Sequence, residues 1–343
     1  MRHATFIVHT VLLALLAAAA AGAREIPPRT IPVPTTVSPA LRPLVAVDPF
    51  TGSYRPKTPE QWKADDEAFA RREAANLPNL CRLGDVTVEE GTAGGVRIYT
   101  ITPNALPPEN ANRILIHLHG GGYVFGSGEG CMGEGILMAG LQRYRVVSVD
   151  YRLAPGSPFP AAVDDALAAY REIEKRVGAK RIGVFGSSAG GGLTLALALR
   201  IKAEGLPMPA ALGCGSPWTD LTKTGDSYYA NDTVDNVLVH YEGWLEDAAK
   251  TYAGATDMRN PLLSPVNGDV QGLPPTILAS GTRDLFLSNT VRMHTKLRDA
   301  GIPADLLVFE AQSHVQYLLS FDALETQRFF REFGKFFDRH LEK

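Results

Sequence analysis

The sequence predicts an α/β fold in which helices flank a mostly parallel central β-sheet, with a helical cap added to it. Short apolar runs recur between residues 113 and 309, and segments with a helical repeat separate them. Most runs are apolar at consecutive positions, which is typical of strands buried on both faces of a parallel sheet. One run, 181–187, passes through a glycine-rich turn straight into a strong helix former. Repeated strand–helix units of this kind build a sheet covered on both faces.

The first 23 residues are interpreted as a secretory signal peptide that is not part of the fold. A basic start, Met1-Arg2-His3, precedes an apolar run at 6–21, and Ala21-Gly22-Ala23 resembles a cleavage site. The run is shorter than the about 20 apolar residues that a membrane span needs. We therefore expect cleavage after residue 23, export to the periplasm or the exterior, and no stable membrane insertion afterwards.

An arm and then one large domain, residues 48–343, are expected to follow. Residues 24–47 are rich in proline, which favours an extended arm. Residues 59–76 are charged and helical in pattern, with Trp62 and Phe69 among them. Strand-like runs come next, at 85–88, 95–101 and 113–119, with a proline-containing loop at 103–112.

Strands and helices then alternate to the end of the chain, with one interruption. The further strands are expected at 145–149, 181–187, 209–215, 275–280 and 305–309. The helices are expected at 159–177, from 193, at 290–300 and at the C-terminus, with Phe330, Phe333, Phe337 and Leu341 on one stripe. The interruption, residues 226–256, is aromatic, with Tyr228, Tyr229 and Trp244, and is helical from 241 to 252.

The composition argues against several partners and cofactors. The net charge of −3 and the lack of a Lys/Arg cluster argue against nucleic acid or an anionic membrane surface as a partner. Three cysteines, Cys81, Cys131 and Cys214, cannot form a disulfide framework, although a Cys81–Cys131 bridge stays open. His117 and His119 read more simply as a strand pair than as metal ligands, and we expect no metal and no cofactor.

A nucleophilic serine is predicted at the end of the strand at 181–187. Gly186-Ser187-Ser188-Ala189-Gly190 has the Gly-x-Ser-x-Gly pattern between a strand and a helix. The pattern needs glycine two residues before and after the serine because a strained turn exposes the hydroxyl. The alternative is a small-residue turn that contains serine by chance, so other segments have to decide.

A glycine run, His119-Gly120-Gly121-Gly122, directly follows the strand that ends at Leu118. Consecutive glycines leave backbone N–H groups free to point into a cleft, which is how an oxyanion hole is built from main chain. The alternatives are an ordinary glycine turn or a phosphate loop. A phosphate loop would need a following Lys-Ser/Thr or the Gly-x-Gly-x-x-Gly spacing, and neither is present.

A serine nucleophile needs a base and a carboxylate that orients the base. Of the eight histidines, only His314 lies in a loop just past a C-terminal strand. Asp284 follows the preceding strand and lies between Ser188 and His314 in the chain, with Asp220 as its nearest rival. Loops at the carboxyl ends of parallel strands are where such sheets place active sites, so these three residues are expected to meet there.

These motifs resemble the hormone-sensitive-lipase-like family of α/β-hydrolase carboxylesterases, from about residue 95 onward. Further matching segments are 150–155, 159–165, 216–221 and 272–276. The resemblance implies an α/β-hydrolase fold with Ser188 as nucleophile, His314 as base and Asp284 as its orienter. It also implies an oxyanion hole formed by the amides of Gly121, Gly122 and Ala189, and a cap from about residues 48–80 and 226–256.

Two positions depart from the family pattern. Ser187 stands before the nucleophile where Asp or Thr is usual, and Gly156 stands where Glu often follows Leu-Ala-Pro. Neither departure removes a triad residue, but both leave the preferred acyl group or alcohol open.

The sequence therefore predicts an exported serine hydrolase that cleaves carboxylic esters through an acyl-enzyme, with short acyl chains or small alcohols preferred. A lactone hydrolase or a deacetylase would use the same residues. A non-catalytic ligand-binding protein on this fold is a more distant alternative, because such proteins typically lack the histidine that His314 supplies here. Natural substrate and oligomeric state are not indicated.

Overall fold

The computed structural model describes residues 25–49, 55, 56 and 58–343. The chain divides into two compact units, residues 1–33 and 34–343. In the first unit, the described residues 25–33 form neither helix nor strand. The expected signal peptide lies outside the described residues, so its cleavage stays a prediction. In the part of the chain that the structure describes, no helix is long and apolar enough to cross a bilayer.

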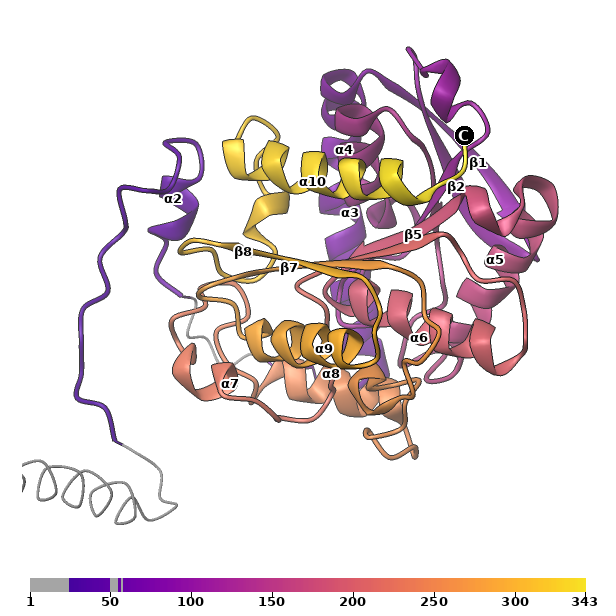
Figure 1. The fold of residues 1–343 in the computed structure, drawn as a ribbon. Coiled ribbons are helices and arrows are strands. Elements are labelled where there is room, and N and C mark those ends of the chain that lie inside the picture. The colour runs from indigo at the N-terminus through magenta and orange to yellow at the C-terminus, as the bar shows by residue number, and fades with distance from the viewer. Residues whose placement is uncertain (1–24, 50–54, 57) are drawn as a thin grey trace, which may run out of the picture. The chain divides into compact units, whose positions relative to one another are not determined.

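The second unit is built around an eight-stranded, mostly parallel sheet (Figure 1). Its strand order is β1-β2-β4-β3-β5-β6-β7-β8. The six strands from β4 to β8 in this order are parallel to one another, whereas β2 is antiparallel to both β1 and β4. The strands are β1 (Val86–Ala93), β2 (Val96–Pro103), β3 (Ile114–Leu118), β4 (Arg145–Val149), β5 (Ile182–Ser187), β6 (Ala211–Gly215), β7 (Thr276–Gly281) and β8 (Ala304–Phe309).

Helices cover both faces of this sheet, so the predicted fold class is confirmed. α3, α4 and α10 pack on one face, and α5, α6 and α9 pack on the other (Figure 1). The described helices are α2 (Arg42–Val45), α3 (Pro59–Gly84), α4 (Gly133–Gln142), α5 (Ala161–Val177), α6 (Ala189–Ala203), α7 (Ser227–Ala230), α8 (Trp244–Ala253), α9 (Leu287–Asp299) and α10 (Leu324–His340).

Each face of the sheet has its own hydrophobic core. On one face, Phe333 and Phe337 of α10 lie against Gly213 and Gly183, where an added Cβ atom would come within 2.9 Å and 2.7 Å of the rings. The predicted phenylalanine stripe is thus seated in gaps left by glycines of the central strands. On the other face, α6 consists largely of Ala, Leu and Gly and is buried on nearly all sides. A helix that is apolar all round belongs in the interior, and α6 gives the preceding turn a rigid support.

Among the longer helices, α3 and α4 differ most from what the sequence predicts. α3 continues to Gly84, past the expected end at residue 76, although it contains Pro78. α4 is absent from the predicted elements because its glycines lower intrinsic helix propensity. Its buried residues Ile136, Leu137 and Met138 pack in the core on the α10 face, and this packing overrides the propensity.

The predicted arm, residues 24–47, is only partly extended, which corrects that expectation. Residues 34–47, here named the arm segment, belong to the second unit and contain α2. Its apolar residues join a small core with two residues from distant loops: Val37, Leu41, Val45, Ala311 and Ala323. The hydroxyl of Ser38 donates to Glu325 at 2.5 Å. Val37, Leu41 and Val45 are spaced four residues apart, which indicates a single buried face. The prolines around them favour an extended chain instead, so the composition points away from this face.

The two segments expected to form a cap meet beside the glycine run. Trp62 of α3 and Trp244 of α8 each contact Phe125, with ring centroids 5.6 Å and 6.1 Å apart. In the same insertion Tyr228 is buried, whereas Tyr229 is 66% exposed. The division of the domain into core and cap stays a prediction, but these rings bring both segments to the end of β3.

Candidate active site

Ser188 lies in a strained turn between β5 and α6. Its φ of 60° and ψ of −126° lie in a region that residues with a side chain rarely adopt. The carbonyl oxygen of Leu118 approaches so closely that a Cβ atom added at Gly186 or Gly190 would lie 2.0 Å or 1.9 Å from it. The amide of Ser188 donates to Gly215 of β6 at 2.8 Å. Contact between the turn and the end of β3 therefore explains both glycines of the motif.

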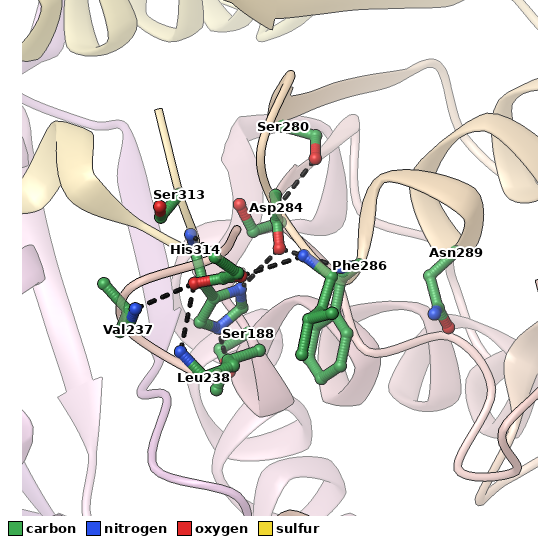
Figure 2. A network of polar contacts seen from close by, with 12 residues as sticks. Ser188, Val237, Leu238, Ser280, Asp284, Phe286, Asn289, Ser313 and His314 are labelled. Carbon is green, nitrogen blue, oxygen red and sulfur yellow. Dashed lines mark hydrogen bonds and ion pairs between the residues drawn. The ribbon is translucent and has the colours of Figure 1, made fainter. Parts of the chain in front are cut away.

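The structure brings His314 and Asp284 into line with Ser188 (Figure 2). His314 Nε2 lies 2.8 Å from Ser188 Oγ, and His314 Nδ1 lies 3.0 Å from Asp284 Oδ1. The loops that carry them follow β8 and β7. Because these strands run parallel to β5, all three loops lie at the same edge of the sheet. The serine, histidine and aspartate singled out in the sequence are thus within hydrogen-bond distance of one another.

Asp284 is fully buried and is held as a carboxylate. The amide of Phe286 donates to Oδ1 and the hydroxyl of Ser280 donates to Oδ2, both at 2.8 Å (Figure 2). Burial alone would raise the pKa of Asp284, but the charge of His314 and hydrogen bonds from His314, Ser216 and Phe286 outweigh it and lower the pKa. An ionised Asp284 accepts a hydrogen bond from Nδ1–H of the imidazole, which leaves the unprotonated Nε2 facing the serine.

A second buried carboxylate, that of Asp235, contacts the same two loops and is missing from the sequence-predicted site. It accepts four backbone hydrogen bonds, from Val237 (2.9 Å), Leu238 (3.0 Å), Leu285 (2.9 Å) and His314 (3.3 Å). Burial and the charge of Asp284 raise the pKa of Asp235 to about 6. Asp235 lies in the aromatic insertion, where no motif or spacing singles it out.

The glycine run presents its amides beside the serine. A Cβ atom added at Gly120 would lie 3.4 Å from Ser188 Cβ, so the run packs against the turn. Gly121 and Gly122 have φ values of 107° and 63°, which favour glycine. Among the described residues, neither of their amides donates to a protein acceptor. The amide of Ala189 stands at the first position of α6, where no helical partner exists.

His119 orients this run. Its Nδ1 lies 2.7 Å from the carbonyl oxygen of Gly120, and a carbonyl only accepts, so Nδ1 carries the proton. Burial lowers the pKa of His119 to about 4, which keeps the ring neutral. The ring stacks on Tyr151 with centroids 4.0 Å apart. Since the N–H of a trans peptide points opposite to its carbonyl, this hydrogen bond turns the Gly121 N–H away from His119.

Ser187, the departure before the nucleophile, is bonded to a carboxylate from another element. Its amide and hydroxyl both donate to Glu134 of α4, at 3.1 Å and 2.7 Å. Glu134 also lies 3.3 Å from His117 Nε2, and His117 Nδ1 lies 3.0 Å from Ser148 Oγ. A carboxylate of α4 is therefore hydrogen-bonded to both the amide and the side chain of the residue before the nucleophile.

Other residues considered from the sequence lie outside this constellation. Asp220, the rival acid, pairs with Arg292 at 2.8 Å instead of with a histidine. All three cysteines are free, so the Cys81–Cys131 bridge left open by the sequence is not formed. Within the described ranges, no group of three or more His, Cys, Asp or Glu side chains could hold a metal ion.

The chain is similar to hydrolases and esterases in both sequence and structure. Residues 115–318 match the family model of the alpha/beta hydrolase fold. An acetyl-hydrolase of Streptomyces hygroscopicus is 35% identical over 234 residues, which are 68% of this chain and 75% of that protein. The crystal structure of an esterase E25 is similar with a TM-score of 0.89 and 39% identity, over 93% of this chain and 99% of that one. An esterase from the bacterial hormone-sensitive lipase (HSL) family gives a TM-score of 0.78 and 30% identity, over 89% and 99%.

The chain therefore belongs to the α/β-hydrolases. More narrowly, it is a member of the hormone-sensitive-lipase-like carboxylesterase family, which the glycine run and the serine turn indicate from the sequence.

Proposed function

We propose that this protein hydrolyses carboxylic esters through an acyl-enzyme formed on Ser188. The observation that carries the proposal is the unbroken line of hydrogen bonds from Ser188 through His314 to Asp284, at 2.8 Å and 3.0 Å. The strained turn presents the hydroxyl, and Nε2 of the imidazole lies within hydrogen-bond distance of it. This is the arrangement that activates a serine for nucleophilic attack.

The reaction follows from the positions of these groups. His314 Nε2 takes the proton of Ser188 as Oγ attacks the ester carbonyl carbon, and the negative charge collects on the former carbonyl oxygen. The amides of Gly121, Gly122 and Ala189 donate to that oxygen. The ester C–O bond then breaks, and His314 gives its proton to the leaving alcohol. A water molecule, deprotonated by His314, releases the acid and restores the serine.

Esters with short acyl chains or small alcohols are the proposed substrates. Two observations support this preference: a relative is named acetyl-hydrolase, and large rings crowd the glycine run. Trp244 lies so close that a Cβ atom added at Gly122 would be 3.3 Å from its ring. Lactones and acetylated substrates would be attacked by the same groups, so a panel of p-nitrophenyl esters from acetate to palmitate, together with lactones, decides among these classes. Faster turnover of long-chain than of short-chain esters would contradict the preference.

The mature enzyme is proposed to act outside the cytoplasm, on small molecules, without nucleic acid or a membrane as a partner. The basic start, the apolar run at 6–21 and the Ala-Gly-Ala site support export. N-terminal sequencing of protein recovered from the medium or periplasm checks this, since the mature chain should begin at Arg24.

The test of the serine is substitution combined with labelling. Ser188→Ala is expected to reduce kcat by on the order of 10⁶, because the nucleophile itself is removed while packing is unchanged. Treatment with an organophosphate should leave an adduct on Ser188, located by mass spectrometry. Ser320→Ala, in the loop before α10, is the matched control and should retain activity. An adduct on Ser187, or residual activity well above background in Ser188→Ala, would contradict the assignment.

A further inference from the structure

The side chain of Asp235 joins three segments that are far apart in the sequence. These are the insertion segment (residues 231–240), the acid loop (282–286) and the base loop (310–316). One oxygen, Oδ1, accepts from two amides of its own turn, those of Val237 and Leu238. The other, Oδ2, accepts from Leu285 at 2.9 Å and from His314 at 3.3 Å. Figure 2 shows Val237 and Leu238 beside His314, each with a dashed line from its amide nitrogen.

We propose that Asp235 is a positioning residue that sets His314 relative to both Ser188 and Asp284. The inference rests on the proposed function and deepens it. Leu285 directly follows Asp284, so a single oxygen atom binds the backbone beside the acid and the backbone of the base. A shift of either loop would stretch the 3.0 Å contact between His314 Nδ1 and Asp284 Oδ1. Displacements of about 1 Å can lower a rate by about 10²-fold, so this register matters for the reaction.

The chemistry of the four bonds requires a carboxylate. All four donors are backbone N–H groups, so both oxygens have to accept. An asparagine offers one oxygen and one NH₂ group, and the NH₂ group would face N–H donors. Asp235→Asn therefore gives up either the turn of the insertion segment or the bridge between the two loops.

Asp235 also brings a second negative charge close to the imidazole. The titratable groups that face it are Asp284 and His314. On its own segment, Asp232 pairs with His240 at 2.9 Å, and both are partly exposed. Two carboxylates favour the protonated imidazole more than one does, so removal of Asp235 should disfavour protonation of the base. A residue with a merely structural role would not have this effect.

The insertion segment is itself held in place on its outer side. The amide of Asn236 donates to Ser313 of the base loop at 3.1 Å. Its side-chain Nδ2 donates to the carbonyl oxygens of Leu44 at 2.9 Å and Val47 at 2.8 Å, in the arm segment. Asp235 is therefore anchored between the base loop and the arm segment, which suits a residue that has to keep two loops in register.

The experiment measures kcat, KM and the pH profile of Asp235→Asn and Asp235→Glu on p-nitrophenyl acetate. Asp235→Asn should lower the plateau kcat by about 10- to 100-fold with KM changed by less than about twofold. Its kcat/KM should hold to a lower pH than that of the unmodified enzyme, because the imidazole has lost a neighbouring charge. Asp235→Glu keeps the charge and should lower kcat without this displacement. Asp220→Asn is the matched control, a buried aspartate away from the triad, and should show neither effect.

Two outcomes overturn the proposal. One is a folded Asp235→Asn enzyme with the kcat of the unmodified protein. The other is an Asp235→Asn enzyme with a lowered kcat whose kcat/KM declines in acid at the same pH as that of the unmodified protein. If Asp235→Asn does not fold, amide hydrogen exchange on the unmodified protein decides: the amides of Leu285 and His314 should be protected, and rapid exchange at either refutes the bridge. Failure of the proposed function is distinct, since it shows as activity that persists in Ser188→Ala or as an organophosphate adduct elsewhere.

Discussion

Asp284 and Asp235 are both fully buried and both bind His314, yet their pKa values move in opposite directions. Asp284 binds the imidazole side chain, and its pKa is lowered although burial opposes this. Asp235 binds only backbone amides, and burial together with the charge of Asp284 raises its pKa to about 6. A partner that can itself become positively charged therefore outweighs desolvation, whereas four neutral amides do not.

The opposite pKa shifts indicate that the two carboxylates have different roles at this site. Asp284 remains ionised throughout the pH range in which a histidine can act as a base, so it can stabilise the imidazolium at every turnover. Asp235 is ionised at neutral pH and loses that charge in mild acid. The first carboxylate contacts the imidazole directly, whereas the second contacts the backbone of the two loops.

The largest expected effect is that of Asp284→Asn. The neutral amide neither stabilises the imidazolium nor fixes the tautomer, and kcat should fall by about 10⁴. Steady-state kinetics on p-nitrophenyl acetate measures kcat of Asp284→Asn and of Asp235→Asn in the same assay. The ratio of the two values compares the two aspartates. A folded Asp284→Asn enzyme that is more active than Asp235→Asn would reverse their roles.

The pH dependence of stability gives an intermediate effect. The pKa of Asp235 is about 6 in the folded state against an ordinary 3.8, so the folded protein binds this proton more tightly than the unfolded chain. Stability contributed by this group is therefore present below about pH 4 and is lost as the pH rises to about 6, by on the order of 3 kcal/mol.

Urea unfolding at pH 4.5 and 7 checks this contribution. The free energy of unfolding of the unmodified protein minus that of Asp235→Asn should decrease between the two pH values, since the variant has no such proton. A difference that increases with pH would mean that the folded state favours the ionised form of Asp235 and would contradict the raised pKa.

The smallest expected effect on catalysis is that of Asp220→Asn. Asp220 is also buried, but its partner is Arg292, whose side chain is 34% exposed. We expect kcat to stay within about twofold and the free energy of unfolding to fall by about 1–2 kcal/mol, because solvent screens the pair. Should Asp220→Asn lower kcat more than Asp284→Asn in folded protein, Asp220 would be the acid.

The parts of the site that depend on local chain geometry could be predicted from the sequence. The two glycines around Ser188 are required by the close approach of the Leu118 carbonyl oxygen, and the strand–turn–helix pattern around the serine indicates this turn. His314 and Asp284 could be found because parallel strands bring the loops at their ends to one edge. Position in the chain therefore singles out residues whose side chains lie within hydrogen-bond distance of one another in the structure.

Asp235 could not be found in this way. It binds Leu285 and His314, which lie 50 and 79 residues further on, through their backbone amides. Every residue except proline has such an amide, so the partners leave no signature in the sequence. The helices of α4 and of the arm segment could not be predicted for a related reason. Their glycine-rich or proline-rich composition disfavours a helix, and only their burial in the tertiary structure stabilises one.

The contacts of the arm segment join residues that are synthesised at widely separated times. It leaves the ribosome early, but Gln316, which donates to the carbonyl of Leu44, comes 272 residues later, and Glu325, which binds Ser38, comes 287 residues after it. At about 5–20 residues per second, the segment waits on the order of tens of seconds for its partners. The arm segment can therefore dock only after residues 316 and 325 have been synthesised, and the base loop lacks this support until then.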